Sequence, residues 1–225
     1  MKLDKRYERN RIFSREQQEE LSEKKAAVIG CGGLGGYAIE MLARAGVGHI
    51  KVCDGDVFDE TNLNRQLLCT EALLGKGKAE AAAERIKAIN SEIEAETVSC
   101  NLTEENAAEI LGGCDVVIDA LDSVSAKMLL QKACRQQEIP MVHGAIGGWF
   151  GQVTTIFPGN DTLSVIYPEG TEVSQELGNP SFSPAMTAAM QVSEAIKVIL
   201  GSEELLMRKM LFIDLLTNDF QVVEV

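Results

Sequence analysis

Basic residues are scarce in this chain, and their scarcity excludes one class of partner. The 225 residues include 21 Lys and Arg against 34 Asp and Glu, which gives a formal net charge of −13 at pH 7. Nucleic acids and anionic membrane surfaces attract proteins with an excess of positive charge. The first 25 residues hold eight Lys or Arg against six Asp or Glu, but we expect neither nucleic acid nor a membrane as a partner.

Long apolar runs are also absent. A helix that crosses a bilayer needs about 20 consecutive, mainly apolar residues, and the sequence has no run of that kind. The first residues, Met1 to Asp4, lead into further charged residues rather than into the apolar stretch of a secretory signal. We therefore expect a cytoplasmic protein, with residues 1–225 forming one α/β domain that buries a sizeable core.

Closely spaced cysteine pairs are the third absence. The six cysteines are Cys31, Cys53, Cys69, Cys100, Cys114 and Cys134. No two of them are separated by only two residues, which is the spacing typical of zinc ligands. Most lie in apolar or strand-like segments, where a free cysteine behaves as a small buried hydrophobic residue. The sequence therefore predicts reduced, buried thiols rather than disulfides or metal ligands.

A glycine-rich turn stands near the start of the chain. Gly30, Gly32 and Gly35 fit the pattern G-x-G-x-x-G directly after the apolar run 26–29, and an apolar-periodic segment follows. This order is typical of the strand, tight turn and helix of a nucleotide-binding βαβ unit. Glycines let the backbone approach a phosphate closely, and the helix start supplies free N–H groups. Asp54 ends the next apolar run, where an acidic side chain can bind ribose hydroxyls.

The polar residues that follow change the interpretation from NAD to a triphosphate. Asn62, Arg65 and Gln66 come within about a dozen residues of Asp54, and Lys78 stands at the entry to an Ala-rich helix. A hydride-transfer enzyme has no triphosphate to cleave. Arg65 and Lys78 together can hold a triphosphate and stabilise the charge that builds up when its α-phosphorus is attacked. Either cation alone would more often be a solvated surface charge.

Two carboxylates follow the apolar run Val116–Ile118. A side chain just past the carboxyl end of a strand lies at the crevice where ligands bind in such folds. Asp122 suits Mg²⁺, which prefers few carboxylates together with phosphate oxygens and water. Its alternative role is N-cap of the helix that begins near Ser123, and the two roles can coexist. Asp119 is expected to be structural, as are both histidines.

Alternating strand and helix patterns predict the fold class. We expect strands at 26–30, 49–53, 94–99, 115–120 and 140–144, and helices at 34–45, 76–90, 103–111 and 123–137. Ser14 and Gln17 fit a capping box that opens an earlier helix, within an amino-terminal arm of residues 1–25. After residue 144 we expect short strands at 152–157 and 162–167, a mobile crossover loop at 168–184, a helix at 184–200 and strands at 209–215 and 219–224. The prediction is a Rossmann-like, doubly wound and mainly parallel sheet, extended by antiparallel strands near the carboxyl terminus.

In order and spacing, these motifs resemble the ThiF/MoeB/HesA adenylyltransferases, which are bacterial relatives of the ubiquitin-activating enzymes. The matching residues are Gly30, Gly32, Gly33, Gly35, Asp54, Asp56, Asn62, Arg65, Gln66, Lys78 and Asp122. The amino-terminal Arg6-Tyr7-Glu8-Arg9 is similar to the entry motif of the family, and residues 185–200 are similar to its late helix. The resemblance spans nearly the whole chain.

The resemblance implies an enzyme that adenylates the carboxyl-terminal glycine of a small ubiquitin-like sulfur carrier ending in Gly-Gly, for sulfur incorporation in cofactor biosynthesis. The implied cofactors are ATP and Mg²⁺. Gly33 and its neighbours would hold phosphate and adenosine, Asp54 ribose, and Asp122 with Ser123 beside it the magnesium end of the site. The same carry-over puts Asn62, Arg65, Gln66 and Lys78 on the phosphates, with Asp56 nearby. Arg9 would reach the triphosphate from the other subunit of a homodimer.

The chain departs from many relatives in its cysteines, and two alternatives stay open. The Cys-x-x-Cys pairs that bind structural zinc in relatives are missing near 163–167 and near the carboxyl end, so we expect no zinc. The segment 169–184 also lacks the cysteine that some relatives use. A non-catalytic binding protein would fit these losses, but it leaves Arg65, Lys78 and Asp122 without a role. An NAD-dependent oxidoreductase would use only the glycine motif and Asp54.

Overall fold

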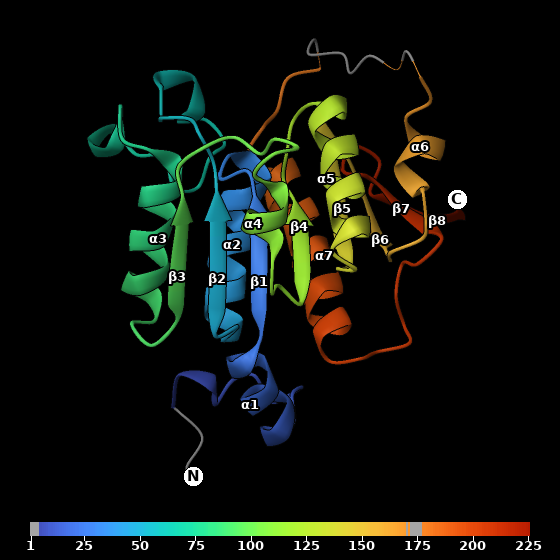
Figure 1. Cartoon of the computed structure of the whole chain (residues 1–225). Helices are drawn as coiled ribbons and strands as arrows, with labels where there is room; N and C mark the ends of the chain where they lie inside the picture. Colours follow the sequence, from blue (N-terminus) through green and yellow to red (C-terminus); the bar gives the residue numbers. More distant parts are fainter. Residues whose placement is uncertain (1–4, 170, 172–176) are drawn as a thin grey trace.

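The eight described strands of the computed structural model form one sheet (Figure 1). The structure describes residues 5–169, 171 and 177–225. The strands are β1 (Lys25–Ile29), β2 (His49–Cys53), β3 (Glu94–Val98), β4 (Val116–Asp119), β5 (Met141–Gly147), β6 (Phe150–Ile156), β7 (Lys209–Asp214) and β8 (Asp219–Glu224). The α-helices are α1 (Arg15–Glu23), α2 (Gly33–Ala45), α3 (Lys78–Ile89), α4 (Ala107–Leu111), α5 (Val124–Gln136), α6 (Thr162–Ile166) and α7 (Phe182–Ile199).

The order of the strands creates a crevice beside β1. Along the sheet the order is β3-β2-β1-β4-β5-β6-β7-β8, with β1 to β5 parallel and β6 to β8 antiparallel. Ile29 of β1 is level with both Cys53 of β2 and Asp119 of β4. Because the chain leaves β1 toward β2 but later returns to β1 as β4, the connections diverge here, and ligands bind at such a point in open α/β sheets.

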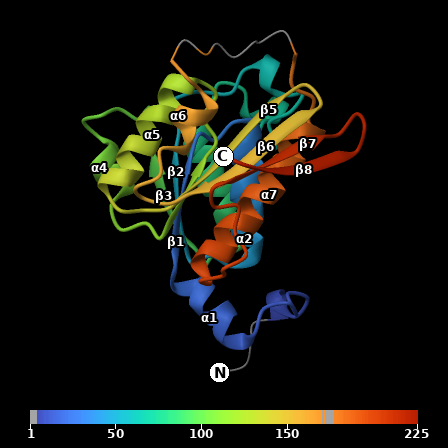
Figure 2. The same cartoon turned by 90° about the vertical axis from the view of Figure 1, so that its right-hand side faces the viewer.

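Helices cover both faces of the sheet (Figures 1 and 2). Helices α2, α3 and α7 contribute to one apolar cluster, and α4, α5 and α6 contribute to the other. Neighbouring residues of β1 show the division, because Val28 packs into the first cluster and Ile29 into the second. Side chains alternate along a strand, so apolar residues on both sides are what a sheet covered on two faces requires. The predicted fold class is confirmed.

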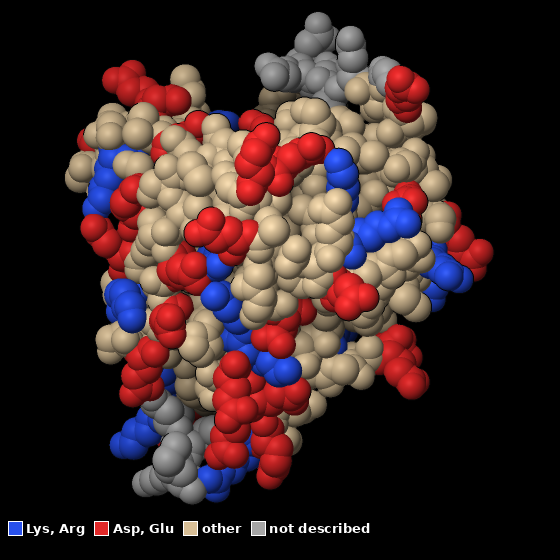
Figure 3. Space-filling model, in the orientation of Figure 1, with Lys and Arg blue, Asp and Glu red and all other residues tan. Residues whose placement is uncertain are grey.

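The amino-terminal arm packs beneath the sheet. The predicted capping box is present, since Ser14 Oγ accepts from the backbone N–H of Gln17 (3.2 Å) and Gln17 Oε1 accepts from that of Ser14 (2.9 Å). Helix α1 lies at the lower end of the molecule in Figure 1, and acidic side chains gather over it in Figure 3. Among the described helices, none combines the length and apolar character that a bilayer crossing requires.

The structure contradicts the strand predicted at 162–167, which is the short helix α6. Leu163 is fully buried, whereas Val165 is 67% exposed. Ile166 and Tyr167 pack against the same apolar cluster as Leu163. Apolar contacts three and four residues apart have the spacing of a helix, not of a strand. The β-branched residues of this segment favoured the wrong prediction.

Two other predicted segments differ in extent. The helix predicted at 103–111 is limited to α4, because Asn106 Oδ1 accepts a backbone N–H three residues earlier (2.7 Å) and closes a separate turn. The loop predicted at 168–184 gives its last three residues to α7. Residues 170 and 172–176 lie outside the described residues, so the mobility of this loop stays a prediction.

The glycine-rich turn between β1 and α2 depends on a contact that excludes side chains. A Cβ on Gly35 would lie 1.8 Å from the carbonyl oxygen of Gly30, and a Cβ on Gly30 would lie 2.6 Å from the carbonyl oxygen of Ala120. Gly30 also has a φ of +96°, in the region that favours glycine. A Cβ on Gly33, in contrast, would make only ordinary contact at 3.6 Å with Pro184. The turn therefore requires glycine at two of its positions for reasons of space.

We predict that Gly35→Ala lowers the free energy of unfolding by about 2 kcal/mol or more, because the added methyl group meets backbone atoms that cannot yield locally. Gly33→Ala is the matched control in the same helical turn, and it should leave stability unchanged or raise it by up to about 1 kcal/mol through helix propensity. Urea unfolding of both variants measures the difference. Equal stability of the two would contradict the contact between Gly35 and Gly30.

Candidate active site

A cavity of about 1180 Å³ opens at the carboxyl ends of the parallel strands. Its wall includes ten of the residues predicted from sequence, namely Gly30, Gly32, Gly33, Asp54, Asp56, Arg65, Gln66, Lys78, Asp122 and Ser123. These residues come from the ends of β1, β2 and β4 and from the starts of α2, α3 and α5 or the loops before them. The parallel sheet brings them together because its strands all end at one edge.

Asp54 is held in place by the backbone around it. Its Oδ2 accepts from the N–H of Cys31 in the glycine-rich turn (2.7 Å), and its Oδ1 accepts from the N–H of Asp56 (2.8 Å). The carboxylate therefore joins the end of β2 to the turn after β1. A carboxylate offers about four acceptor positions, so Asp54 retains capacity to accept from hydroxyl groups of a ligand.

Two cations lie on the same wall. Lys78, the first residue of α3, is 7% exposed, and its Nζ donates to Asp56 (3.0 Å). Arg65 uses Nη1 to donate to the carbonyl of Thr61 (2.9 Å) and to Oδ1 of Asn64 (2.9 Å). A guanidinium has five N–H donors, so these contacts orient Arg65 and leave donors for an anion.

Gln66 carries a buried acceptor beside the glycine-rich turn. The side chain lies against Gly32, and the residue is 6% exposed. Its Oε1 has no hydrogen-bond partner among the described residues. Buried polar atoms in folded proteins are nearly always paired. The residue lines the cavity, but this atom is itself buried, so Gln66 contributes to the site through its contact with Gly32.

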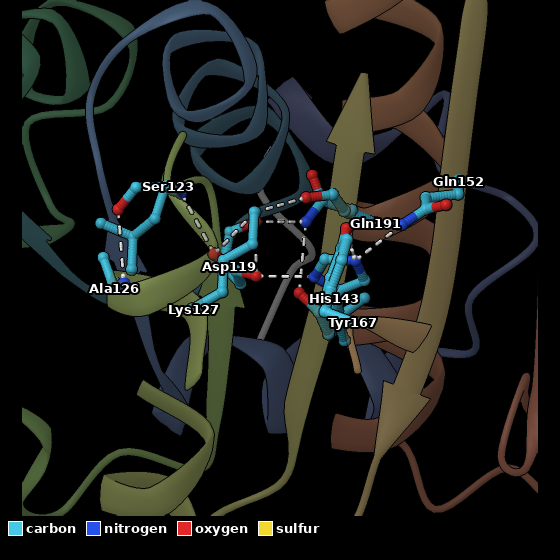
Figure 4. Close-up of polar contacts among 11 residues, drawn as sticks. Asp119, Ser123, Ala126, Lys127, His143, Gln152, Tyr167 and Gln191 are labelled. Carbon is cyan, nitrogen blue, oxygen red and sulfur yellow. Dashed lines mark hydrogen bonds and ion pairs between the residues drawn. The ribbon is translucent and has the colours of Figure 1, made fainter. Parts of the chain in front are cut away.

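Asp122 lines the cavity and is not the N-cap of helix α5. The N-cap of α5 is Ser123, whose Oγ accepts from the N–H of Ala126 (3.3 Å; Figure 4). The capping role considered for Asp122 thus belongs to its neighbour. Asp122 is exposed and lines the cavity.

Three predicted residues do not line the cavity. Gly35 packs against Gly30, as described above. Asn62 is 5% exposed, and its Oδ1 accepts from the backbone N–H of Asp59 (3.3 Å), where it completes a capping box. Its amide is engaged in the local turn before Arg65, and its role on the phosphates stays a prediction.

Arg9 is the third, and it lies at the end of the parallel strands opposite the cavity. Two residues earlier, the hydroxyl of Tyr7 accepts from Nδ2 of Asn90 (2.9 Å) at the carboxyl end of α3, and Gln18 donates to the carbonyl of Ala45 (2.8 Å) at the end of α2. The cavity lies at the starts of these two helices. Strands β1, β2 and β3, which run between the two ends, are each five residues long, or roughly 16 Å. Arg9 is exposed and does not reach the cavity of its own chain.

The cysteines are all free, and five of the six are buried, as predicted. Burial raises the pKa of Cys31 well above its usual value and the pKa of Cys53 to about 12. These two thiols beside the glycine-rich turn are therefore protonated at neutral pH and unreactive. Cys100 is the exception, since it is exposed and lines the cavity.

A buried polar network, which the sequence did not reveal, forms the base of the cavity (Figure 4). Asp119 is fully buried and accepts from Nζ of Lys127 with both oxygens (3.1 and 3.2 Å) and from Nδ1 of His143 (2.7 Å). Lys127, Gln152 and Tyr167 of this network line the cavity. Burial would raise the pKa of Asp119, but the charge of Lys127 and the hydrogen bond from His143 hold it below its usual value.

The protonation state of His143 sets the direction of the outer part of the network. Burial lowers the pKa of His143 below its usual value, against the opposite effect of Asp119. The neutral ring donates through Nδ1, so Nε2 is an acceptor. It faces the hydroxyl of Tyr167 and Nε2 of Gln152, each at 3.3 Å, and Gln152 also donates to that hydroxyl (2.6 Å). Burial also raises the pKa of Tyr167, which is therefore neutral. The structural role expected for Asp119 and His143 is consistent with this arrangement.

Comparison with known proteins places the chain among adenylating enzymes. The ThiF family model matches residues 6–225. The chain is 35% identical to the SAMP-activating enzyme E1 of Haloferax volcanii, over 97% of this chain and 84% of that protein. It is 33% identical to the sulfur carrier protein ThiS adenylyltransferase of Bacillus subtilis, over 88% of this chain and 62% of that protein. It spans about half the length of the MOCS3 relatives.

Solved structures show the same fold. Escherichia coli MccB superposes with a TM-score of 0.85 at 21% identity, covering 100% of this chain and 70% of that one. The E. coli tRNA N6-threonylcarbamoyladenosine dehydratase TcdA superposes with a TM-score of 0.72 at 30% identity, covering 85% of this chain and 92% of that one. The resemblance inferred from the motifs is confirmed by the match over nearly the full sequence, and the chain belongs to the ThiF family.

Proposed function

We propose that this protein uses ATP to adenylate the carboxyl-terminal glycine of a small ubiquitin-like sulfur carrier, for sulfur incorporation in cofactor biosynthesis. The observation that carries the proposal is the convergence of Arg65, Lys78 and Asp122 on one cavity at the glycine-rich turn. The start of α2 adds free N–H groups and the positive end of a helix dipole. The activities for which the Haloferax, Bacillus and MOCS3 relatives are named support the same reaction.

The size and shape of the cavity support two substrates rather than one. Pockets for single small ligands usually measure about 300–1,000 Å³, and this cavity measures about 1180 Å³. Asp54 lines the part next to the glycine-rich turn, while Phe150, Gln152 and Asp214 line the part beside β6 and β7. We assign the first part to the nucleotide and the second to the end of the carrier.

The proposed reaction needs charge stabilisation rather than a general base. A carboxylate is already ionised at neutral pH, so its oxygen attacks the α-phosphorus directly. A carboxylate O–P bond forms while the bond from the α-phosphorus to the leaving pyrophosphate breaks. Negative charge builds up on the phosphoryl and leaving oxygens, and Arg65 and Lys78 stabilise it. The product is a mixed anhydride, from which a later sulfur donor displaces AMP.

Asp122 is the residue that would hold Mg²⁺. Its exposed carboxylate lines the cavity, and Ser123 performs the capping of α5 in its place. A single carboxylate beside a triphosphate suits Mg²⁺, which takes most of its ligands from phosphate and water. When bound, the ion neutralises phosphate charge. Zinc is not part of the proposal, because the sequence has no Cys-x-x-Cys pair.

Arg9 would act from a second subunit. In its own chain it lies at the edge of the sheet opposite the cavity, as the contacts of Tyr7 and Gln18 show. A two-fold symmetric homodimer would place the arm of each chain over the cavity of the other, since every contact in such an interface occurs twice.

We predict that Asp122→Ala, Arg65→Ala and Lys78→Ala each reduce carrier-dependent ATP–pyrophosphate exchange by at least about a hundredfold, the scale for removing one stabiliser of developing charge. Lys132→Ala is the control, because this exposed lysine pairs only with Glu104 among the contacts of the described residues. Exchange is measured with a ubiquitin-like carrier that ends in Gly-Gly. Near-normal exchange by Asp122→Ala would end the magnesium assignment, and near-normal exchange by all three would overturn the proposed function.

We also predict complementation between two inactive variants. Arg9→Ala chains have an intact cavity, and Asp122→Ala chains have an intact arm. Random subunit exchange makes about half of the dimers mixed, each with one complete site of two, so activity should recover to about a quarter of wild type. The measurement is pyrophosphate exchange after mixing. No recovery, despite proven subunit exchange, would contradict the placement of Arg9 at the cavity of a partner subunit.

A further inference from the structure

The turn that carries Asp122 is held from two sides. On one side, the N–H of Ala120 donates to the carbonyl of Ile29 (3.0 Å), and the carbonyl of Ala120 lies against Gly30 of the glycine-rich turn. On the other side is the buried network at the base of the cavity (Figure 4). Asp119 is the residue of this network that touches the turn.

One oxygen of Asp119 bonds directly to the backbone next to Asp122. Its Oδ1 accepts from the N–H of Leu121 (3.1 Å), which closes a short turn between β4 and the site. The backbone carbonyl of Asp119 accepts from Nε2 of Gln191 on α7 (2.8 Å). Both the side chain and the main chain of Asp119 are therefore fixed, and only Ala120 and Leu121 separate this anchor from Asp122.

Lys127 holds Asp119 in place and leaves no N–H donor for a ligand. Its ammonium group has three N–H donors, and these are matched by the two oxygens of Asp119 and the carbonyl of Gly144 (2.9 Å). The side chain is 4% exposed. Although Lys127 lines the cavity, its charge is engaged away from it, so it holds the carboxylate of Asp119 in one orientation.

The energetics favour a role in orientation. Removing two charges from water is costly, and a buried ion pair can often be replaced by uncharged residues of similar volume without loss of stability. Stability alone therefore does not account for a charged pair at this position. What the pair supplies, and an apolar pair would not, is a fixed acceptor for the N–H of Leu121.

We propose that Asp119 is a positioning residue, which sets the direction of the Asp122 carboxylate for magnesium through its hydrogen bond to the N–H of Leu121. The inference rests on the proposed function, because it takes Asp122 to hold the ion that accompanies ATP. Asp119 itself touches neither ATP nor the ion. Lys127 and His143 act one step further out, by fixing Asp119.

The test compares two double variants that both lack the ion pair. Asp119→Asn/Lys127→Met keeps a side-chain oxygen that can accept from Leu121, whereas Asp119→Ala/Lys127→Met has none. ATP binding is titrated by calorimetry without carrier, so that no turnover occurs, over a series of Mg²⁺ concentrations. We expect the alanine version to need at least about tenfold more Mg²⁺ for half-maximal binding, the scale for losing a group that orients a metal ligand. The asparagine version should stay within about threefold of wild type, and both should bind ATP equally without Mg²⁺.

A purely structural network would give a different result. In that case the two double variants would show the same Mg²⁺ requirement after correction for their folded fractions, and the inference would be overturned. Thermal unfolding gives these fractions. If the alanine version does not fold, Asp119→Leu/Lys127→Met replaces it, because leucine fills the volume and also lacks an acceptor.

A wild-type protein that binds no ATP would overturn the proposed function and this inference together, whereas wild-type binding with equal double variants overturns the inference alone.

Discussion

The site depends on the close approach of three backbone segments around Gly30. Its neighbours are the first turn of α2, where a Cβ on Gly35 would lie 1.8 Å from the carbonyl oxygen of Gly30, and the residue after β4, where a Cβ on Gly30 would lie 2.6 Å from the carbonyl oxygen of Ala120. This contact sets the start of α2 beside the turn that carries Asp122. Without it, the helix dipole and the acidic end of β4 would not face one cavity.

Much of the site could be predicted because its residues follow strand ends. In a parallel sheet, residues just past the strands meet at one edge, so Gly30, Asp54 and Asp122 were assigned together without knowledge of the fold. Lys78 followed from its place at the start of a helix after the same edge. Ile29 of β1 lies level with the last residues of both neighbouring strands, β2 and β4. This register is the physical basis of these predictions.

Other features could not be read from sequence, because they depend on partners far along the chain. Lys127 looks like an ordinary helix cation until Asp119 and Gly144 are seen around its ammonium group. Asn62 has the right type for a phosphate ligand, but it completes a local capping box. The strand predicted at 162–167 is wrong because composition favoured a strand, whereas Leu163 and Ile166 contact the same apolar cluster at the spacing of a helix.

We expect the cavity to bind ATP with magnesium rather than NAD. Calorimetric titration of the wild-type protein with ATP and with NAD, each with and without Mg²⁺, distinguishes the two ligands. The arrangement of Arg65, Lys78 and Asp122 around the glycine-rich turn predicts that ATP binds, that Mg²⁺ strengthens its binding, and that NAD at the same concentration competes weakly or not at all. Tight NAD binding that is independent of Mg²⁺, with no measurable binding of ATP, would contradict the account.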